Sequence, residues 1–201
     1  MGRTNDTGER LEFLWLELTA SCNLECSHCY TESGPSLPII GALETEDWQR
    51  LLDDAAALGC RRVQFIGGEP TLHPGLPDLI AHARARAFDE VCVYTNGTRF
   101  TAALKQAFIE HRVALAFSVY GASAEVHDAV TRRKGSFART CDALRWAVAA
   151  GLSVRAGVIT MARNRNQIEA TKSLLAEIGV RQMDVDRTRG VGRGANSAIS
   201  S

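Results

Sequence analysis

The sequence predicts an α/β fold, a partial (β/α)6 barrel of the TIM type in which parallel strands alternate with helices. The first observation is the spacing of the hydrophobic residues, which switches repeatedly between the period of a strand and that of a helix. The second is that the strand-like runs are almost wholly apolar, as expected for parallel strands that helices cover. The third is that the connections are short, which favours helical crossovers between neighbouring strands.

The composition is that of one globular domain. Of the 201 residues, 45% are hydrophobic and 23% are charged, which excludes disordered, collagen-like and coiled-coil proteins. The 23 basic and 23 acidic residues cancel, so nothing indicates a nucleic-acid surface. No apolar run reaches the length of about 18 residues that a membrane span needs, and the polar start MGRTNDTGER is no secretory signal. We therefore expect a cytoplasmic protein whose six cysteines are not disulfide-bonded.

The first elements follow from local patterns. The run LEFLWLELT at 11–19 is rich in large apolar residues and predicts a strand. A helix is expected over 45–58, with Thr45 as its N-cap and Gly59 just after its end. The next elements are expected to be a strand over 62–67, a helix over 77–88 and a strand over 91–96.

The second half of the chain repeats this alternation. Thr101 and Ser136 are the expected N-caps of two further helices. Asn166, followed three residues later by Glu169, resembles the capping box of another. These helices are expected to end at residues 111, 151 and 179, and the strands that accompany them are expected over 113–120, 152–159 and 180–186.

Functional residues are expected after the carboxyl ends of the strands, where the active sites of such barrels lie. The segments at those ends are 19–36, 67–75, 95–99, 118–135, 157–166 and 184–193. The first contains Cys22, Cys26 and Cys29, spaced CxxxCxxC. A loop with this spacing can turn three thiolates toward one point. Three thiolates bind three irons of a [4Fe–4S] cubane and leave the fourth iron without a protein ligand.

Zinc is the alternative metal for the same loop. It could take the three thiolates together with His28. However, His28 is adjacent to Cys29, and adjacent residues rarely point to the same tetrahedral centre. A typical zinc site also has a second pair of ligands further along, which this sequence does not supply. The spacing therefore favours iron–sulfur, and a non-catalytic zinc-binding module is the alternative from another class.

The cysteine loop resembles the signature of the radical S-adenosylmethionine superfamily, and the resemblance covers about residues 11–190. That signature is CxxxCxΦC after the first strand of a partial (β/α)6 barrel, and Φ is normally aromatic. Here Φ is His28, whose imidazole can still stack beside the cluster or the adenine. The resemblance implies that Cys22, Cys26 and Cys29 hold a [4Fe–4S] cluster. It also implies that the amino and carboxylate groups of S-adenosylmethionine chelate the fourth iron.

The resemblance implies a reaction as well. A low-potential donor such as flavodoxin or ferredoxin supplies one electron, and the sulfonium is cleaved to release a 5′-deoxyadenosyl radical. That radical abstracts a hydrogen from the substrate. The cofactor carries the difficult step, while the protein supplies position and excludes water.

Two motifs at the next strand ends match cofactor-binding segments of the family. Gly67-Gly68-Glu69-Pro70 matches its ammonium-binding motif letter for letter. The glycines allow a close backbone approach, Pro70 stiffens the turn, and the Glu69 carboxylate suits a methionyl ammonium. An ordinary βα turn is the alternative for these residues. Asn96 lies in a TNG segment of the kind found near the S-adenosylmethionine pocket.

The stretch after the fourth strand is implied to complete the cofactor site. Relatives carry Ser-x-Asp-Gly there, and Ser118 matches the serine that reaches the ribose or carboxylate, whereas Tyr120 replaces the aspartate. The stretch 127–136 fits the "HD…R…GSF" pattern of the same relatives. The resemblance implies that Arg132 pairs with the methionyl carboxylate, and a solvated basic turn is the alternative.

The remaining chemical groups have less specific interpretations. Cys60, Cys92 and Cys141 are scattered, and we expect them to be buried thiols. Charged residues close the sixth strand, where they could meet a substrate or form a solvated end: Asp184, Asp186, Arg187 and Arg189.

We divide the chain into a polar N-terminal arm over 1–10, a core over 11–187, and a linker or truncated extension over 188–201. The resemblance is greatest to the peptide-modifying branch with a C-terminal SPASM domain, whose Cys-rich extension holds auxiliary clusters. No cysteine follows Cys141, so the residues given bind no auxiliary cluster. We expect maturation of a ribosomally made peptide. The alternatives within the family are action on a small metabolite and activation of a glycyl-radical partner.

Overall fold

The computed structural model describes residues 11–196 and 198–199, so the expected N-terminal arm lies outside the described residues. Six strands form one sheet: β1 (Leu14–Glu17), β2 (Arg62–Ile66), β3 (Glu90–Thr95), β4 (Ala114–Ser118), β5 (Val154–Thr160) and β6 (Gln182–Arg187). Each strand pairs in parallel with the next one in sequence, in the order β1-β2-β3-β4-β5-β6. The expected fold class, a partial barrel of parallel strands, is confirmed.

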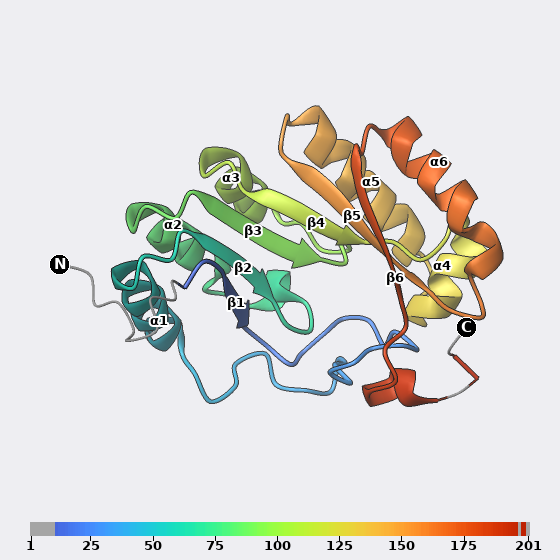
Figure 1. Ribbon diagram of the computed structural model, residues 1–201, viewed down its shortest axis with the longest axis horizontal. Helices are drawn as coiled ribbons and strands as arrows, with labels where there is room; N and C mark the ends of the chain where they lie inside the picture. Colours follow the sequence, from blue (N-terminus) through green and yellow to red (C-terminus); the bar gives the residue numbers. More distant parts are fainter. Residues whose placement is uncertain (1–10, 197, 200–201) are drawn as a thin grey trace.

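Helices connect the strands and cover one side of the sheet (Figure 1). They are α1 (Thr45–Ala57), α2 (Leu76–Ala85), α3 (Ala102–Glu110), α4 (Ala124–Thr131), α5 (Ser136–Ala149) and α6 (Ile168–Ile178). Short 3₁₀ turns occur at η1 (Pro70–Leu72), η2 (Arg165–Gln167) and η3 (Gly192–Ala195). The long blue segment between β1 and α1 runs below the sheet as far as the end of α4, and the red turn η3 lies near it (Figure 1).

The core lies between the helices and the sheet. Phe65 and Phe117 of the strands are fully buried against Ile80, Phe108 and Leu144 of the helices. Each such side chain contributes about 1.5–3 kcal/mol by leaving water. In the described part of the chain, no helix is both long and apolar enough to cross a membrane.

Some helix ends agree with the sequence and others correct it. The Thr101 side chain accepts a hydrogen bond from the Leu104 amide at 3.2 Å and caps α3, as expected. Thr45, by contrast, is the first residue of α1, and Glu44 is its N-cap. Glu44 takes that place because it forms a reciprocal capping box with Asp47.

Two further cap expectations are wrong. Ser136 is the first residue of α5 rather than its cap, because the carboxylate of Asp128 on α4 accepts from the amide of Phe137 at 2.8 Å. The Ser136 hydroxyl itself donates to Asp128 at 2.8 Å. The capping box expected at Asn166 does not form, since α6 begins only at Ile168, after the turn η2.

Candidate functional site

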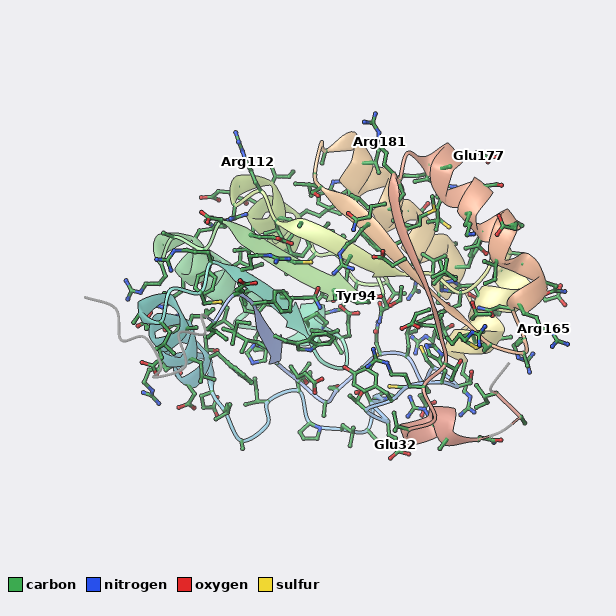
Figure 2. All side chains as sticks on the ribbon, viewed as in Figure 1. Glu32, Tyr94, Arg112, Arg165, Glu177 and Arg181 are labelled. Atoms are coloured by element: carbon green, nitrogen blue, oxygen red, sulfur yellow. The ribbon has the colours of Figure 1, made fainter. Side chains whose placement is uncertain are left out.

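The carboxyl ends of the strands open into a pocket of ≈ 800 Å³. Its wall includes residues from every strand-end segment that the barrel rule selects. Figure 2 shows Tyr94 of β3, one of the lining residues, near the centre of the molecule, while Arg112 and Arg181 lie at its edge. Eight of the candidate residues line this pocket: Cys22, Cys26, His28, Cys29, Gly67, Gly68, Asn96 and Ser118. The structure therefore brings together residues that are far apart in the sequence.

The three cysteines of the loop are free thiols that share this pocket. Burial, helped by the nearby Glu69 and Cys29, raises the pKa of the Cys22 thiol to about 12. Burial also raises the pKa of Cys26, and both other cysteines of the loop add to that shift. The sulfurs are thus near enough to influence one another. A metal that binds them has to displace their protons, since the thiolate is the ligand.

The arrangement of the donors distinguishes a cluster from a single ion. Within residues 11–196 and 198–199, no three His, Cys, Asp or Glu side chains are placed to hold one metal ion. A closed zinc site with His28 as the fourth ligand needs such a convergence. In a [4Fe–4S] cubane each thiolate binds a different iron, so the three sulfurs stand further apart than around a single ion. The three thiols therefore fit a cluster better than zinc.

The Gly67-Gly68 turn holds the base of the cysteine loop. The amide of Gly68 donates to the carbonyl of Thr19 at 2.6 Å, and that of Glu69 donates to Ser21 at 2.8 Å. A Cβ on Gly68 would lie 2.1 Å from the carbonyl oxygen of Ser21, so no larger residue fits there. Both glycines also line the pocket, where their backbone is accessible to a ligand.

Glu69 is placed differently from the sequence expectation of an open carboxylate. Its side chain is 0% exposed and accepts four hydrogen bonds. Thr71 donates through its amide and hydroxyl, Thr95 through its hydroxyl, and Asn96 through its amide, at 2.6–3.1 Å. Burial raises the pKa of Glu69, and these hydrogen bonds lower it. The carboxylate therefore ties the end of β2 to the end of β3 beneath the pocket.

Asn96 extends this network to the first cysteine. Its side-chain amide donates to the Cys22 sulfur at 3.8 Å and to the Asn23 side-chain oxygen at 2.9 Å. Its own oxygen accepts from the amide of Thr98 at 2.9 Å. Glu69, through the Asn96 backbone, thus helps to orient the residue that contacts Cys22.

The two departures from the family pattern contact each other. The rings of His28 and Tyr120 pack edge to face, with centroids 4.6 Å apart and an interplanar angle of 69°. Tyr120, which stands where relatives have aspartate, is 7% exposed and belongs to a small cluster with Val130 and Met161. Burial and the nearby Arg193 lower the pKa of His28 to about 4, so its imidazole is neutral at pH 7. Tyr120, two residues after the end of β4, therefore places an aromatic ring against His28 of the cysteine loop.

A double-mutant cycle tests this pairing. In the protein without metal, His28→Ala and Tyr120→Ala should together cost less than the sum of the two single changes. The expected coupling is about 0.5–1.5 kcal/mol, typical of an aromatic pair, as measured by urea unfolding. Phe100→Ala serves as the matched control, because Phe100 packs against Phe108 and Trp146 instead. If His28 couples equally to Phe100 and to Tyr120, the contact has no specific energy.

Arg132 does not reach the pocket. It ends α4 in the left-handed conformation at φ 55°, and its side chain is exposed. The turn after Arg132 connects α4 to α5, and the Asp128 side chain accepts a hydrogen bond from the amide of Gly135 in this turn. The solvated-turn interpretation of this basic stretch therefore describes it better. The arginines that line the pocket are Arg155, Arg187, Arg189 and Arg193.

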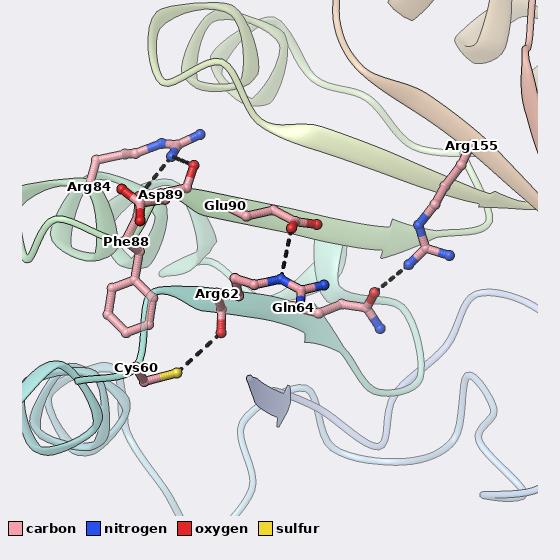
Figure 3. A network of polar contacts seen from close by, with 8 residues as sticks. All are labelled: Cys60, Arg62, Gln64, Arg84, Phe88, Asp89, Glu90 and Arg155. Carbon is pink, nitrogen blue, oxygen red and sulfur yellow. Dashed lines mark hydrogen bonds and ion pairs between the residues drawn. The ribbon is translucent and has the colours of Figure 1, made fainter. Parts of the chain in front are cut away.

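Arg155, Gln64 and Tyr94 are functional candidates that the sequence patterns do not single out, whereas their neighbour Asp184 was a candidate. Figure 3 shows Arg155 of β5 reaching Gln64 of β2, and its Nη2 donates to the Gln64 oxygen at 2.6 Å. Asp184 of β6 lies 3.6 Å from the same guanidinium, which also lies over the Tyr94 ring. Arg155 lies within an otherwise apolar strand pattern, and this is the feature of the sequence that indicates a polar group inside the barrel. These groups all belong to the pocket wall.

Known proteins resemble this chain in sequence and in fold. The family described as the Radical SAM superfamily matches residues 16–175. AlbA of Bacillus subtilis (strain 168), an antilisterial bacteriocin subtilosin biosynthesis protein, is 29% identical over 181 residues, which are 89% of this chain and 40% of that protein. The mycofactocin maturase MftC of Mycobacterium tuberculosis (strain CDC 1551 / Oshkosh) is 35% identical over 183 residues, 90% of this chain and 45% of MftC.

Solved structures agree on the fold. Streptococcus suis SuiB bound to S-adenosylmethionine superposes with a TM-score of 0.79 at 17% identity, over 90% of this chain and 41% of SuiB. SuiB bound to its precursor peptide SuiA superposes with a TM-score of 0.78. The chain thus spans less than half the length of these relatives. Because the family match extends over most of the described fold, this chain belongs to the radical SAM superfamily, which uses a [4Fe–4S] cluster and S-adenosylmethionine.

Proposed function

We propose that this chain holds a [4Fe–4S] cluster through Cys22, Cys26 and Cys29 and acts as a radical enzyme on a peptide. The observation that carries the proposal is that the three thiols of the family motif face one pocket together with the Gly67-Gly68 turn. When bound and reduced, the cluster cleaves S-adenosylmethionine to a 5′-deoxyadenosyl radical, which takes a hydrogen atom from the substrate.

The chain's own residues position the reactants in this proposal. The backbone of Gly67 and Gly68, in the turn that Glu69 and Pro70 complete, receives the methionyl ammonium. Ser118 and Asn96 line the same wall and contact the rest of the cofactor, and His28 lies beside the adenine. Arg132 is left out of this set, since its side chain faces solvent.

Apolar groups of the pocket protect the radical from water. Leu24, Ile66, Tyr120 and Ile159 line the same cavity as the cysteines. A carbon radical abstracts hydrogen from the nearest available bond, so the wall has to present the substrate and exclude competitors. Charged groups at the end of β6, Asp186 and Arg187 among them, are available to bind the polar atoms of a peptide.

The peptide substrate is supported by the relatives rather than by the pocket alone. MftC is a maturase, AlbA serves bacteriocin biosynthesis, and SuiB is solved with a precursor peptide. The proposal includes an external low-potential electron donor of the flavodoxin or ferredoxin type. It also includes a cytoplasmic location, where the six free cysteines of the described chain stay reduced. Residues 11–187 would form the catalytic core, and 188–201 the linker or extension after it.

Anaerobic reconstitution with iron and sulfide tests the proposal. The protein should turn brown, bind about four irons per chain and release 5′-deoxyadenosine when dithionite and S-adenosylmethionine are added. A colourless protein with one tightly bound zinc would overturn it. Mass spectrometry of candidate precursor peptides then distinguishes substrates, since a new crosslink appears as a loss of two hydrogens. A glycyl radical on a partner protein would favour the activase instead.

A further inference from the structure

Arg193, near the end of the described chain, reaches back to the cysteine loop. Its Nε donates to the carbonyl oxygen of Cys26 at 2.8 Å, and its Nη2 donates to that of Ser33 at 2.7 Å. Its backbone amide donates to the carbonyl of Cys29 at 3.0 Å. One residue therefore binds three carbonyl groups of the loop, and two of them belong to expected cluster ligands.

The glycines on either side of Arg193 make this approach possible. Gly192 has φ +55°, and a Cβ there would lie 2.4 Å from the carbonyl oxygen of Tyr30. A Cβ on Gly194 would lie 2.5 Å from the Arg189 oxygen and 3.2 Å from that of His28. The Gly-Arg-Gly sequence is thus fitted to the surface of the loop, although its composition predicts a linker.

The loop is held from two sides that use different backbone groups. On one side its amides donate to carbonyl groups at the end of α4. The Glu25 amide donates to the Thr131 carbonyl at 3.2 Å, and the Ser27 amide donates to the Val130 carbonyl at 2.9 Å. On the other side its carbonyls accept from Arg193. A loop has no helix or sheet ladder to pair its polar groups, so each contact of this kind fixes its shape.

The guanidinium also brings a permanent charge to the site. Arginine stays protonated at any physiological pH, and its planar fork suits two acceptors at once. Arg193 lines the same pocket as Cys22, Cys26 and Cys29. A reduced cluster carries one more negative charge than its oxidised form, so a nearby fixed cation favours reduction.

We propose that Arg193 is a positioning residue that locks the cysteine loop and, through its charge, raises the reduction potential of the cluster that the loop holds. The second part rests on the proposed function, whereas the first does not need a cluster. The proposal assigns the Gly192-Arg193-Gly194 segment to the catalytic unit rather than to a linker.

Three variants separate the two parts. Arg193→Gln removes both the fork and the charge. Arg193→Lys keeps the charge but not the fork. Arg189→Gln is the matched control, since Arg189 lines the same pocket and its loss removes the same charge.

Hydrogen exchange in the cluster-free protein tests the lock. Amides of residues 22–34 should exchange about ten- to hundredfold faster in Arg193→Gln and in Arg193→Lys, because bonds from a charged donor are lost or weakened. Arg189→Gln should exchange like the wild type. Unchanged exchange in both Arg193 variants would overturn the lock.

Redox titration followed by electron paramagnetic resonance tests the charge. The midpoint potential of the reconstituted cluster should become more negative in Arg193→Gln and stay near the wild-type value in Arg193→Lys. An unchanged potential in Arg193→Gln, or an equal shift in Arg189→Gln, would overturn a specific effect of Arg193. A wild-type protein that binds no cluster would defeat the proposed function and this second part. The exchange measurement would still decide the lock.

Discussion

Replacement of Cys26 by alanine should abolish cluster assembly and lower the formation of 5′-deoxyadenosine by at least about a thousandfold. A cubane with two protein thiolates is poorly held, because each iron–thiolate bond lost also exposes that iron to solvent. Cys26 lies between the two anchors of the loop, with its carbonyl bound by Arg193 and the next amide bound by Val130. The backbone that presents its sulfur is therefore fixed from both sides.

Iron and sulfide analysis, together with product assay by chromatography, measures this effect. Cys60→Ala is the matched control, because Cys60 is also a free thiol, is 0% exposed, and donates its S–H to the Arg62 carbonyl away from the pocket. The control should bind iron like the wild type while losing some stability. Wild-type product formation by Cys26→Ala would defeat the assignment of the ligands. An equal loss of iron in Cys60→Ala would show that the effect is one of folding.

The strands and the place of the pocket could be predicted because they depend on local pattern and on a general rule. Apolar runs mark the strands from β1 to β5, and a parallel arrangement brings the carboxyl ends to one edge. Cys22, Gly67 and Asn96 therefore come together at the pocket, although nothing in the sequence states their distances. The CxxxCxxC spacing added the chemistry, since few other loops need three thiols so close together.

Features that depend on a distant partner could not be predicted. The cap of α5 comes from Asp128 on the preceding helix, so Ser136 only looked like a cap. Arg193 bonds to Cys26, which lies 167 positions earlier in the sequence, and a Gly-rich segment carries no hydrophobic period to announce this. Such contacts depend on the surface against which a segment packs. That surface is formed by residues elsewhere in the chain, so the local sequence pattern gives no information about it.

The Tyr120 substitution shows a related limit. In the sequence, Tyr120 stands where the family pattern has an aspartate, and His28 stands where it has an aromatic residue. The fold places these two side chains in contact, which neither position indicates by itself. Single positions can be compared with a motif, but contacts between positions require the fold.

Glu69→Ala should destabilise the protein strongly, in addition to any loss of S-adenosylmethionine binding. The carboxylate accepts four hydrogen bonds, and its removal leaves the donors of Thr71, Thr95 and Asn96 buried without a partner. An unsatisfied buried donor costs about 1–3 kcal/mol, and these donors relax together, so we expect a loss of about 3 kcal/mol or more. For a chain of this size that corresponds to a decrease in Tm of roughly 6–12 °C.

Urea or thermal unfolding of the metal-free protein measures this loss. Glu90→Ala is the matched control, because Glu90 forms an exposed ion pair with Arg62 at 3.0 Å, and such pairs contribute at most about 1 kcal/mol (Figure 3). A Glu69→Ala protein as stable as Glu90→Ala would mean that the buried network is not the main role of the carboxylate.

Glu69→Gln separates the structural role from the cofactor role. The amide keeps one acceptor oxygen but sets an N–H₂ group against a donor, so part of the stability should be lost while the fold persists. Measured on the reconstituted protein, S-adenosylmethionine affinity should stay near the wild-type value in this variant, and a marked fall would show that the carboxylate itself meets the ammonium. Affinity equal to the wild type, with stability reduced, would instead leave the ammonium to the backbone of Gly67 and Gly68, which line the pocket where the Glu69 side chain is fully buried. The motif would then act by shaping the loop around Cys22 through Asn96, rather than by offering a charge.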